Sequence, residues 1–489
     1  MSFLPLVAFI VALAMLSGRA AAATDCVCNY SANVDYFDTK LVPQFATHFN
    51  ISYHHSYKVI TVQTHNTYPD LIQHKTYIAY LCGTPVPQGV GGIAVEIPIK
   101  TVGLTSVTYL PYVNFLGMLP SVYFMNQKPS TMTSCMRKLY DEGQVQIETV
   151  GIWNAYHSYY AYYDIDSTSA KNISAQVGAL SAFFYGRSDE VNTPEIVGNL
   201  FGNKTVSILM GETDEDISLG TFEWLYVMAA LFNMEATAKV IADNVFARYT
   251  CNSNLVKAAT IDGPKFIWGY FYDSTWYGVT CPSWECALVA NANGTFLDTG
   301  TLTVDEFVAN ANVLAAEVII YADFNWNMTS PYGNPPIYAG ANVAKLNAVP
   351  AVAKHKVYDF LSTHYSEFFD NLKALPDVVL LDLIQVGFND SFVPNRHRYY
   401  LRNVFTEVPV PFTDEPASAC ADPATPLNGG WLTGPCSTSG VPVNISYTQP
   451  DLCSTAPPTS APRSSALATA AASAVVFAVL AFAAVAVAW

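Results

Sequence analysis

Basic residues are scarce in this chain of 489 residues, which has 23 Lys and Arg against 39 Asp and Glu and a formal net charge of −16. Nucleic acids and anionic lipid surfaces are bound through clustered positive charge, so the composition argues against both as partners. The excess of negative charge mainly implies solubility. We therefore predict no nucleic-acid partner.

Several catalytic motifs are missing as well. The chain has no nucleophile elbow, no phosphate-binding glycine loop, no pair of zinc-binding histidines and no kinase motif set. Mechanisms of the α/β-hydrolase, P-loop and zinc-protease types lack support, and we predict a protein that is not an enzyme and has no covalently bound cofactor. A secreted hydrolase with an unrecognised site stays open as an alternative.

The acidic run 212–216 reads Glu-Thr-Asp-Glu-Asp and offers carboxylates that suit a hard cation such as calcium. It lacks the spacing and the glycine of an EF-hand loop. We interpret it as a solvated loop and predict no metal site.

Both ends of the chain are apolar. Residues 1–23 combine an apolar stretch with a run of alanines, as a secretory signal peptide does. Residues 466–489 are continuously apolar, end without a basic tail and follow a Ser/Thr/Pro/Ala-rich spacer, which is typical of a GPI-anchor signal attached among residues 454–465. A single transmembrane helix is the alternative. We expect a protein on the outer leaflet of the plasma membrane, held there by a lipid anchor.

The ten cysteines form an even set in a chain expected to be secreted, so we predict disulfides of unknown connectivity. A zinc site at Cys281 and Cys286 is disfavoured because no histidine pair follows them. Eight N-x-Ser/Thr sequons suit a glycoprotein of the cell surface. They begin at Asn29, Asn50, Asn172, Asn203, Asn293, Asn327, Asn389 and Asn444.

The first half of the chain alternates strand and helix patterns. Residues 58–64 and 76–81 alternate like paired strands, and residues 94–103 form a third strand. Residues 107–116 have helical spacing, with Thr105 or Ser106 as the cap and Gly117 as the stop. Further apolar strands are predicted over 145–151 and 205–211, with a helix over 173–184 between them. These patterns predict a three-layer α/β lobe.

A long helix is predicted next. Apolar residues recur three to five positions apart from 221 to 249, charged residues take the other faces, and neither Pro nor Gly interrupts the pattern. At 1.5 Å per residue this helix would be roughly 43 Å long. We expect it to act as a stiff strut between two lobes.

The second half repeats the α/β pattern. Strands are predicted over 266–270, 316–322 and 355–360, and helices over 286–292, 303–311, 343–351 and 377–387, with Pro376 at the first turn of the last. Beyond about residue 409 the chain is rich in Pro, Ser, Thr and Ala and contains three cysteines, which favours a stalk.

Residues 265–279 (KFIWGYFYDSTWYGV) hold seven aromatic rings and are the most informative segment for function. A short strand there leads into polar aromatic residues at its carboxyl end, the place where open α/β sheets bind ligands. The turn at 273–275 is expected to leave Trp276 and Tyr277 displayed. A buried strand with an aromatic core is the alternative interpretation.

The order of residues 219–224 (LGTFEW), the long helix, Trp268-Gly269, residues 275–277 (TWY), HKVYDF and PDVVLLDLI resembles bacterial periplasmic solute-binding proteins of the helical-backbone class. Members of that family are the binding components of ABC importers for ferric siderophores, haem and cobalamin. The resemblance extends from about Lys58 to Leu401. It implies two three-layer α/β lobes joined by one long rigid helix, with a ligand cleft between the lobes.

The resemblance also implies where ligand contacts lie. In the first lobe it points to His65, Asn66 and Tyr68, and to Thr105, Ser106 and Tyr109. In the second lobe it points to Trp268, Tyr270, Tyr272, Trp276, Tyr277, Trp284 and residues 362–367, which include His364 and Tyr365. Aromatic rings suit a large, flat or chelated ligand. The predicted ligand-binding residues are Tyr68, Tyr109, Trp268, Tyr272, Trp276, Tyr277 and Tyr365.

Two features depart from the family. A lipid-anchored surface protein has no evident permease to receive its cargo. In addition, residues 151–166 are unusually rich in tyrosine and include His157, which is a candidate iron ligand or a structural residue.

The leading hypothesis is a cell-surface protein that captures an iron chelate, haem or corrinoid for uptake, with a membrane transporter or an endocytic receptor as the next partner. The alternative is an adhesion or interaction ectodomain that keeps the scaffold without small-molecule binding. The predicted order is a signal peptide (1–23), an N-terminal extension (24–57), a first lobe (58–220), an inter-lobe helix (221–249), a second lobe (250–405), a stalk (406–465) and an anchor signal (466–489).

Overall fold

The computed structural model describes residues 26–67, 70–126, 132–147, 177–186, 193–259, 262–330, 333–362, 374–388, 391–392, 398–410 and 413–425. Two compact units divide the chain: Asp35–Gln449 is one, and Met1–Val34 with Pro450–Trp489 is the other. All the helices and strands named below belong to the first of these units. The predicted signal peptide and anchor signal lie outside the described residues. Within the described residues, no helix is both long and apolar enough to cross a membrane.

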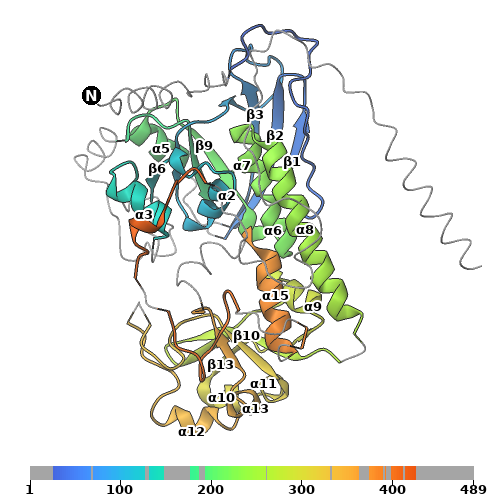
Figure 1. The fold of residues 1–489 in the computed structure, drawn as a ribbon, viewed down its shortest axis with the longest axis vertical. Helices are drawn as coiled ribbons and strands as arrows, with labels where there is room; N and C mark the ends of the chain where they lie inside the picture. Colours follow the sequence, from blue (N-terminus) through green and yellow to red (C-terminus); the bar gives the residue numbers. More distant parts are fainter. Residues whose placement is uncertain are drawn as a thin grey trace, which may run out of the picture. The chain divides into compact units, whose positions relative to one another are not determined.

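A four-stranded sheet opens the fold (Figure 1, blue). Its order is β1-β2-β3-β4, with antiparallel pairing between the first three strands and parallel pairing between the last two. Because β1 belongs to this sheet, the first lobe begins within the segment assigned by sequence to an N-terminal extension. The strands are β1 (Phe49–Tyr53), β2 (Tyr57–Thr67), β3 (Asp70–Leu81) and β4 (Ile93–Ile97).

A second, fully parallel sheet follows in the order β7-β6-β5-β8-β9. Ser106 caps the helical turn after β5 by accepting a hydrogen bond from the Thr108 N–H, and Gly117 has a φ of 68° just past the next helix, as the sequence predicts. The elements are β5 (Val102–Leu104), η1 (Val107–Tyr109), α2 (Leu110–Phe115), η2 (Leu119–Ser121), β6 (Val122–Met125), α3 (Ser134–Asp141), β7 (Gln146–Ile147), β8 (Ala182–Gly186), α5 (Thr193–Phe201), β9 (Val206–Met210) and η3 (Glu212–Asp214).

Two of the elements predicted for this half of the chain are wrong. The strand predicted over 94–103 is divided between the two sheets, because Pro98 has no N–H to continue the ladder and the Ile99 N–H donates instead to the Leu231 carbonyl. The helix predicted over 173–184 ends in a strand, β8. All five residues of β8 are buried, and a short, continuously apolar run does not distinguish a buried strand from a buried helix.

The helix predicted over 221–249 is three helices. Asn233 has a φ of 58° and ends α7, since its N–H donates to the Ala229 carbonyl in a left-handed cap. Asn tolerates this conformation, so the break needs neither Gly nor Pro. The longest of the described helices, α8, has 23 residues and spans roughly 34 Å at 1.5 Å per residue. The helices are α6 (Ser218–Glu223), α7 (Leu225–Phe232) and α8 (Glu235–Lys257).

A third sheet of seven strands lies in the second half (Figure 1, yellow and orange). Its main path is β13-β11-β10-β14-β15-β16, and β12 pairs with β10. We call β1 to η3 the first lobe and β10 to β16 the second lobe. The strands are β10 (Lys265–Tyr272), β11 (Thr275–Gly278), β12 (Thr295–Phe296), β13 (Thr301–Thr303), β14 (Val318–Tyr321), β15 (Val357–Asp359) and β16 (Arg402–Asn403).

Most helices of the second lobe agree with the sequence, but the single helix predicted over 343–351 is two helices, because the backbone of Val349 is extended. Pro376 stands in the first turn of α15, as predicted, and Thr303 and Glu306 form a capping box at α10. The predicted α/β fold class is confirmed, with one parallel and two mixed sheets. The helices are α9 (Trp284–Asn291), α10 (Val304–Ala309), α11 (Ala311–Ala315), α12 (Asn342–Leu346), α13 (Pro350–Ala353) and α15 (Pro376–Gly387).

Side chains of α8 form an ion pair and hydrogen bonds with two helices of the second lobe, α15 and α9. The Arg248 Nε lies 2.7 Å from a carboxylate oxygen of Asp377 at the start of α15. The Asn291 side chain, on α9, donates to the Tyr249 hydroxyl at 2.9 Å and accepts from the Lys257 ammonium at 2.9 Å. These contacts explain how α8 supports the second lobe although the continuous helix is absent.

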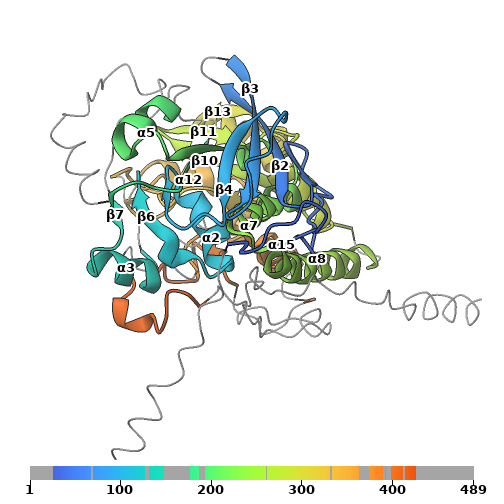
Figure 2. The same ribbon diagram turned by 90° about the horizontal axis from the view of Figure 1, so that it is seen from above.

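The segment after the second lobe does not behave as a stalk throughout. Residues around η5 (Ala417–Ala419) lie beside α3 of the first lobe in both views (Figures 1 and 2). Cys420 forms a disulfide with Cys135, and Asp414 pairs with Arg137 at 2.8 Å. The predicted disulfides are confirmed; Cys281 and Cys286 form a second one, and Cys26, Cys28, Cys82 and Cys251 are also disulfide-bonded.

Candidate functional site

The aromatic segment singled out in the sequence forms a tight hairpin of β10 and β11. Tyr270 pairs with Tyr277 and Tyr272 with Thr275. Asp273 and Ser274 make the two-residue turn with φ values of 45° and 60°, the backbone that such hairpins require. The predicted turn is therefore confirmed, but the chain returns from it as a second strand. Alternate residues of both strands point to opposite faces of the sheet.

Trp276 belongs to the inner face of this hairpin and is fully buried. Its indole N–H donates to the Thr299 hydroxyl at 2.8 Å, and its ring lies 4.8 Å from that of Phe307. Gly269 makes room for it, because an added Cβ would stand 2.6 Å from a ring carbon of Trp276. The expectation that Trp276 is displayed is wrong. It lies in the core between the sheet and α10.

Tyr270, Tyr272 and Tyr277 occupy the outer face of the same hairpin, with 40%, 56% and 39% of their surface exposed. The rings of Tyr270 and Tyr277 stack, with centroids 5.6 Å apart and planes inclined by 23°. The expectation that Tyr277 is displayed is confirmed, since 39% of its surface is exposed. Large rings left uncovered on a sheet are a common mark of a binding surface.

Trp268 lies on the same face of β10 as Tyr270 and Tyr272 but deeper in the lobe, and only 2% of its surface is exposed. Its ring meets that of Trp284 edge-on at 5.7 Å and that of Phe360 at 6.1 Å. Trp284 opens α9 and lies within the short loop that the Cys281–Cys286 disulfide closes. Trp268 thus forms the buried base of this row of rings. We call Trp268, Tyr270, Tyr272, Tyr277, Trp284 and Phe360 the aromatic face.

One carboxylate adjoins the aromatic face. Tyr321 pairs with Gly269 and the Ala322 N–H donates to the Gly269 carbonyl at 2.8 Å, so Ala322 lies beside Tyr270 on β10 and Asp323 is the next residue. Burial raises the pKa of the Asp323 carboxyl, against a smaller lowering by the Phe324 N–H. Burial, then the charges of Tyr277 and Asp323, raise the pKa of the Tyr270 hydroxyl. Asp323 and Tyr270 are therefore electrostatically coupled.

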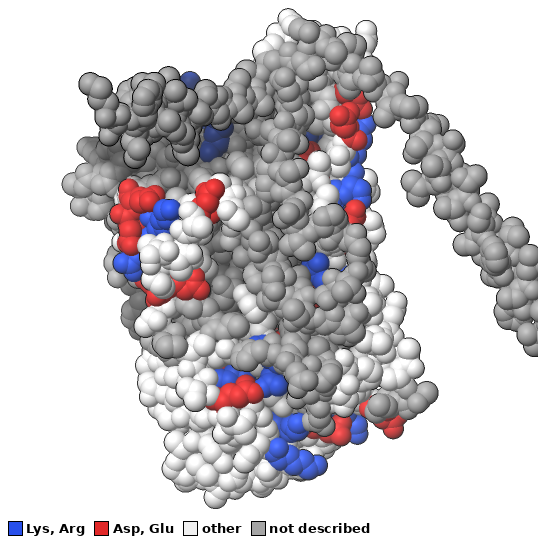
Figure 3. Space-filling view, in the orientation of Figure 1, with Lys and Arg blue, Asp and Glu red and all other residues white. Residues whose placement is uncertain are grey.

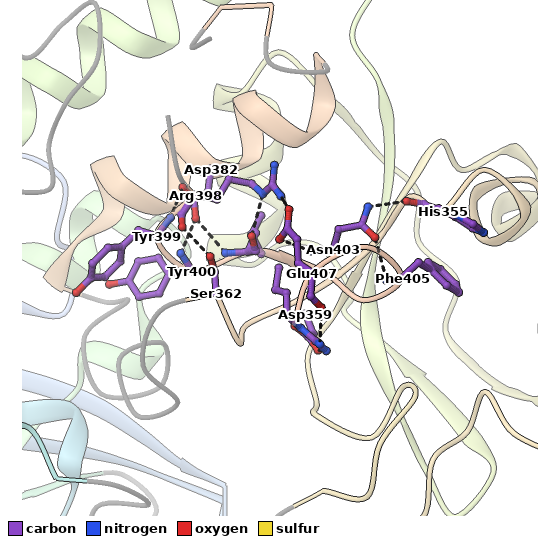
Figure 4. Close-up of polar contacts among 12 residues, drawn as sticks. His355, Asp359, Ser362, Asp382, Arg398, Tyr399, Tyr400, Asn403, Phe405 and Glu407 are labelled. Carbon is purple, nitrogen blue, oxygen red and sulfur yellow. Dashed lines mark hydrogen bonds and ion pairs between the residues drawn. The ribbon is translucent and has the colours of Figure 1, made fainter. Parts of the chain in front are cut away.

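Two arginines near β15, the strand that pairs with β14, form ion pairs with carboxylates of the chain. Figure 4 labels one of them, Arg398, and its partner Glu407. Arg402 forms a buried, two-pronged ion pair with Asp359 at the end of β15. Arg398 pairs with Glu407 and lies over the ring of Tyr358, 5.5 Å from its centroid. Their positive charge is already compensated by carboxylates.

In the first lobe, two of the residues predicted to contact a ligand, Thr105 and Tyr109, are buried. Tyr109 is only 2% exposed and Thr105 only 3%. Ser106 caps η1, and the Thr108 hydroxyl donates to the Glu212 carboxylate at 3.2 Å. Tyr109 therefore packs inside the lobe rather than lining an open surface. Tyr68 and Tyr365 lie outside the described residues, as do His157, His364 and residues 148–176.

The acidic run 212–216 is not a solvated loop, which corrects the sequence interpretation. Glu212 and Glu215 are buried, and Glu215 accepts hydrogen bonds from the N–H groups of Thr47 and His48 and from the Trp224 indole. The Glu215 carboxylate holds the segment before β1 in place, and the Glu212 carboxylate accepts a hydrogen bond from the Thr108 hydroxyl. Within the described residues, no group of three or more His, Cys, Asp or Glu side chains is placed to hold a metal ion.

Glu223, on α6, has the same role as Glu215. Its carboxylate accepts from the N–H groups of Gln44, Phe45 and Ala46 at 2.7 to 3.0 Å. Nothing in the sequence marks this contact, because the partners lie 177 to 179 residues apart along the chain. Together, the Glu215 and Glu223 carboxylates hold the backbone of residues 44–48.

Comparison with known proteins gives a distant likeness only. No family model and no curated protein matches the chain. Among solved structures, it is similar to a periplasmic binding protein of Veillonella parvula (12% identity, TM-score 0.42, covering 69% of this chain and 92% of the other). It is also similar to the periplasmic catecholate-siderophore binding protein VctP of Vibrio cholerae (9%, 0.41, 68% and 100%). A periplasmic heme binding protein of Pseudomonas aeruginosa gives 10%, 0.39, 60% and 93%.

Proposed function

We propose that this protein binds a small solute on the aromatic face of its second lobe. The observation that carries the proposal is the stacked, half-exposed pair of Tyr270 and Tyr277 above the buried Trp268. Water covers these rings in the free protein, and a flat or bulky apolar ligand would release it. Each fully buried ring contributes about 1.5 to 3 kcal/mol.

The arrangement favours binding over catalysis. Trp276 and Thr299 fix the inner face of the hairpin, so the outer rings are held on a rigid strand pair rather than on a mobile loop. Hydroxyl groups at Tyr270, Tyr272 and Tyr277 supply oriented hydrogen bonds around the apolar surface. Rigid aromatic surface with a few polar groups is the usual composition of a small-molecule site.

We further propose that the solute is a metal chelate, a haem or a corrinoid, and that the protein captures it at the cell surface for uptake. The family resemblance of the sequence and the large ring area support this class of cargo. The apolar ends of the sequence and its eight sequons support a GPI-anchored glycoprotein. Release of the protein from intact cells by a phosphatidylinositol-specific phospholipase tests the anchor.

Ligand titration followed by tryptophan fluorescence tests the binding. The probes are a ferric hydroxamate chelate, haemin and cobalamin. We expect at least one of them to quench the wild-type protein at micromolar concentration, and the double variant Tyr270→Ala/Tyr277→Ala to bind it at least tenfold more weakly, a loss of about 1.4 kcal/mol.

Tyr140→Ala is the matched control, since Tyr140 is 43% exposed but lies on α3. It should bind like the wild type. Unchanged fluorescence with all three probes contradicts solute capture and supports an interaction ectodomain instead. Equal affinities in the wild type and the double variant would place the ligand elsewhere.

A further inference from the structure

We propose that the aromatic face selects a solute that carries a positively charged group, which binds between Asp323 and the rings of Tyr270 and Tyr277. This inference rests on the proposed function and specifies its ligand: a cationic solute, such as a metal chelate with a protonated amine, rather than an anionic one. Asp323 is the specificity-determining residue.

The first support is the position of Asp323. It follows β14, whose Tyr321 pairs with Gly269, so its backbone continues next to the carboxyl end of β10 where Tyr270 stands. The carboxylate is half-buried, and the Phe324 N–H donates to one of its oxygens at 2.7 Å. A half-buried carboxylate interacts more strongly with a nearby charge than one in open water does.

The second support is the lack of a protein cation for this carboxylate. Within the described residues, neither Lys nor Arg forms an ion pair with Asp323, whereas Asp359 at the end of the next strand is paired with Arg402. Arg398 is held by Glu407. A ligand at the aromatic face would therefore meet a negative charge that the described part of the chain leaves uncompensated.

The third support is the rings themselves. The faces of tyrosine rings carry negative electrostatic potential and attract ammonium and guanidinium groups. The Tyr270 ring lies on the strand next to β14 and interacts electrostatically with Asp323, and the Tyr277 ring stacks against it from β11, one strand farther away. An anionic ligand would be repelled by the Asp323 carboxylate and by the faces of the rings, in a protein whose net charge is already −16.

Charged groups on the surface agree with this preference. On the face shown in Figure 3, Lys and Arg lie in small groups next to Asp and Glu, and the surface over α10 to α13 is mostly uncharged. Among the residues of that face that Figure 3 does not draw in grey, no extended basic area is present to attract an anionic chelate.

Three ferric chelates that differ only in the charge of one arm test the inference. Ferrioxamine B carries a free ammonium group, its N-acetyl derivative is neutral and its N-succinyl derivative is anionic. We expect the wild type to bind ferrioxamine B about tenfold more tightly than the acetyl form and to bind the succinyl form most weakly.

In Asp323→Asn the three affinities should become equal within about threefold, while the acetyl chelate keeps its wild-type affinity. That retained affinity shows that the variant is folded. Asp262→Asn is the control, because Asp262 is an exposed carboxylate just before the amino end of β10; it should keep the full preference.

The outcomes separate the two proposals. Equal binding of all three chelates to the wild type, or an unchanged preference in Asp323→Asn, overturns the charge selection and leaves solute capture intact. If none of the three binds to the wild type even at millimolar concentration, capture of this class of chelate is wrong, and the charge selection is wrong with it.

Discussion

The two lobes use polar and aromatic side chains in opposite ways. Directly after the first lobe, Glu215 and Glu223 are buried and accept hydrogen bonds from backbone N–H groups, and Lys58 in β2 of the lobe is fully buried. In the second lobe, Tyr270 and Tyr277 are half-exposed on the surface of a strand pair. Glu215, Glu223 and Lys58 therefore stabilise the fold, whereas the rings of Tyr270 and Tyr277 are available to a ligand.

The same difference occurs within one hairpin. Trp276 and Tyr277 are neighbours in sequence, yet Trp276 is fully buried and Tyr277 is 39% exposed. Alternation along the strand decides which of the two faces the core. Substitutions on the two faces should therefore differ in their cost, and those that disturb buried groups should cost most.

Lys58→Met should have the largest effect on stability. The Lys58 ammonium lies 2.5 Å from the Glu235 carboxylate and 2.8 Å from the Ala230 carbonyl, inside the first lobe. Burial lowers the pKa of Lys58 and raises that of Glu235, so each depends on the other's charge. Removing the lysine leaves a buried carboxylate uncompensated and should lower the free energy of unfolding by about 3 to 5 kcal/mol, measured in urea.

A double variant sharpens this result. Lys58→Met/Glu235→Leu removes both charges and should recover most of the lost stability, since an apolar pair of similar volume can replace a buried ion pair. A double variant as unstable as Lys58→Met would show that the charges are not what the site requires.

Cys135→Ser/Cys420→Ser should have the next largest effect. The disulfide joins α3 to the segment after the second lobe across 285 residues of sequence. Its loss should reduce stability by about 2 to 4 kcal/mol and expose the segment around Cys420 to protease. The midpoint of thermal unfolding and the cleavage rate provide the readout; a segment that resists protease as before would mean that its hydrogen bonds to α3 suffice.

Trp276→Phe should cost about 1 to 3 kcal/mol, because the smaller ring leaves a cavity and the Thr299 hydroxyl loses its donor. Tyr277→Phe is the matched change on the other face and should alter stability by less than about 0.5 kcal/mol. Denaturant titrations of both variants test the contrast between the faces. Similar losses from both would show that the outer ring also belongs to the core.

The smallest effect concerns pH. Burial raises the pKa of Asp323, and a bound cation favours the ionised carboxylate. Ferrioxamine B should bind fully above the raised pKa and progressively more weakly as pH falls through it. The Tyr270 hydroxyl does not titrate in that range, since its own pKa is raised above the ordinary tyrosine value. Calorimetric titration at several pH values should show this slope in the wild type but not in Asp323→Asn.

Sequence alone predicted much of the second lobe. Strands β10, β14 and β15 and helix α15 follow from apolar runs and from Pro376, since both signals are local, whereas the short strands β11, β12, β13 and β16 were not predicted. The break at Asn233 was missed because an asparagine in the left-handed conformation carries no mark of its own in a helical pattern.

The aromatic segment shows how far the candidate site could be predicted from the sequence. The pattern locates the rings but leaves two faces to choose between, and the two-residue turn at Asp273 and Ser274 settles which residues of the returning strand face outward. Gly269 is the sequence signal that could have placed Trp276 in the core, because it leaves room for a large ring. The burial of Tyr109 and Glu215 depends on distant partners, which spacing does not reveal.

Chemical modification of exposed tyrosines, read by peptide mass mapping, tests the central claim most directly. In the free protein, a nitrating reagent should modify Tyr270, Tyr272 and Tyr277 on the aromatic face and Tyr140 on α3, all of which are at least 39% exposed. A saturating ligand should protect Tyr270 and Tyr277 and leave Tyr140 reactive. Protection of Tyr140 alone, or unchanged reactivity of all four in the presence of a ligand that binds, would contradict a site on the aromatic face.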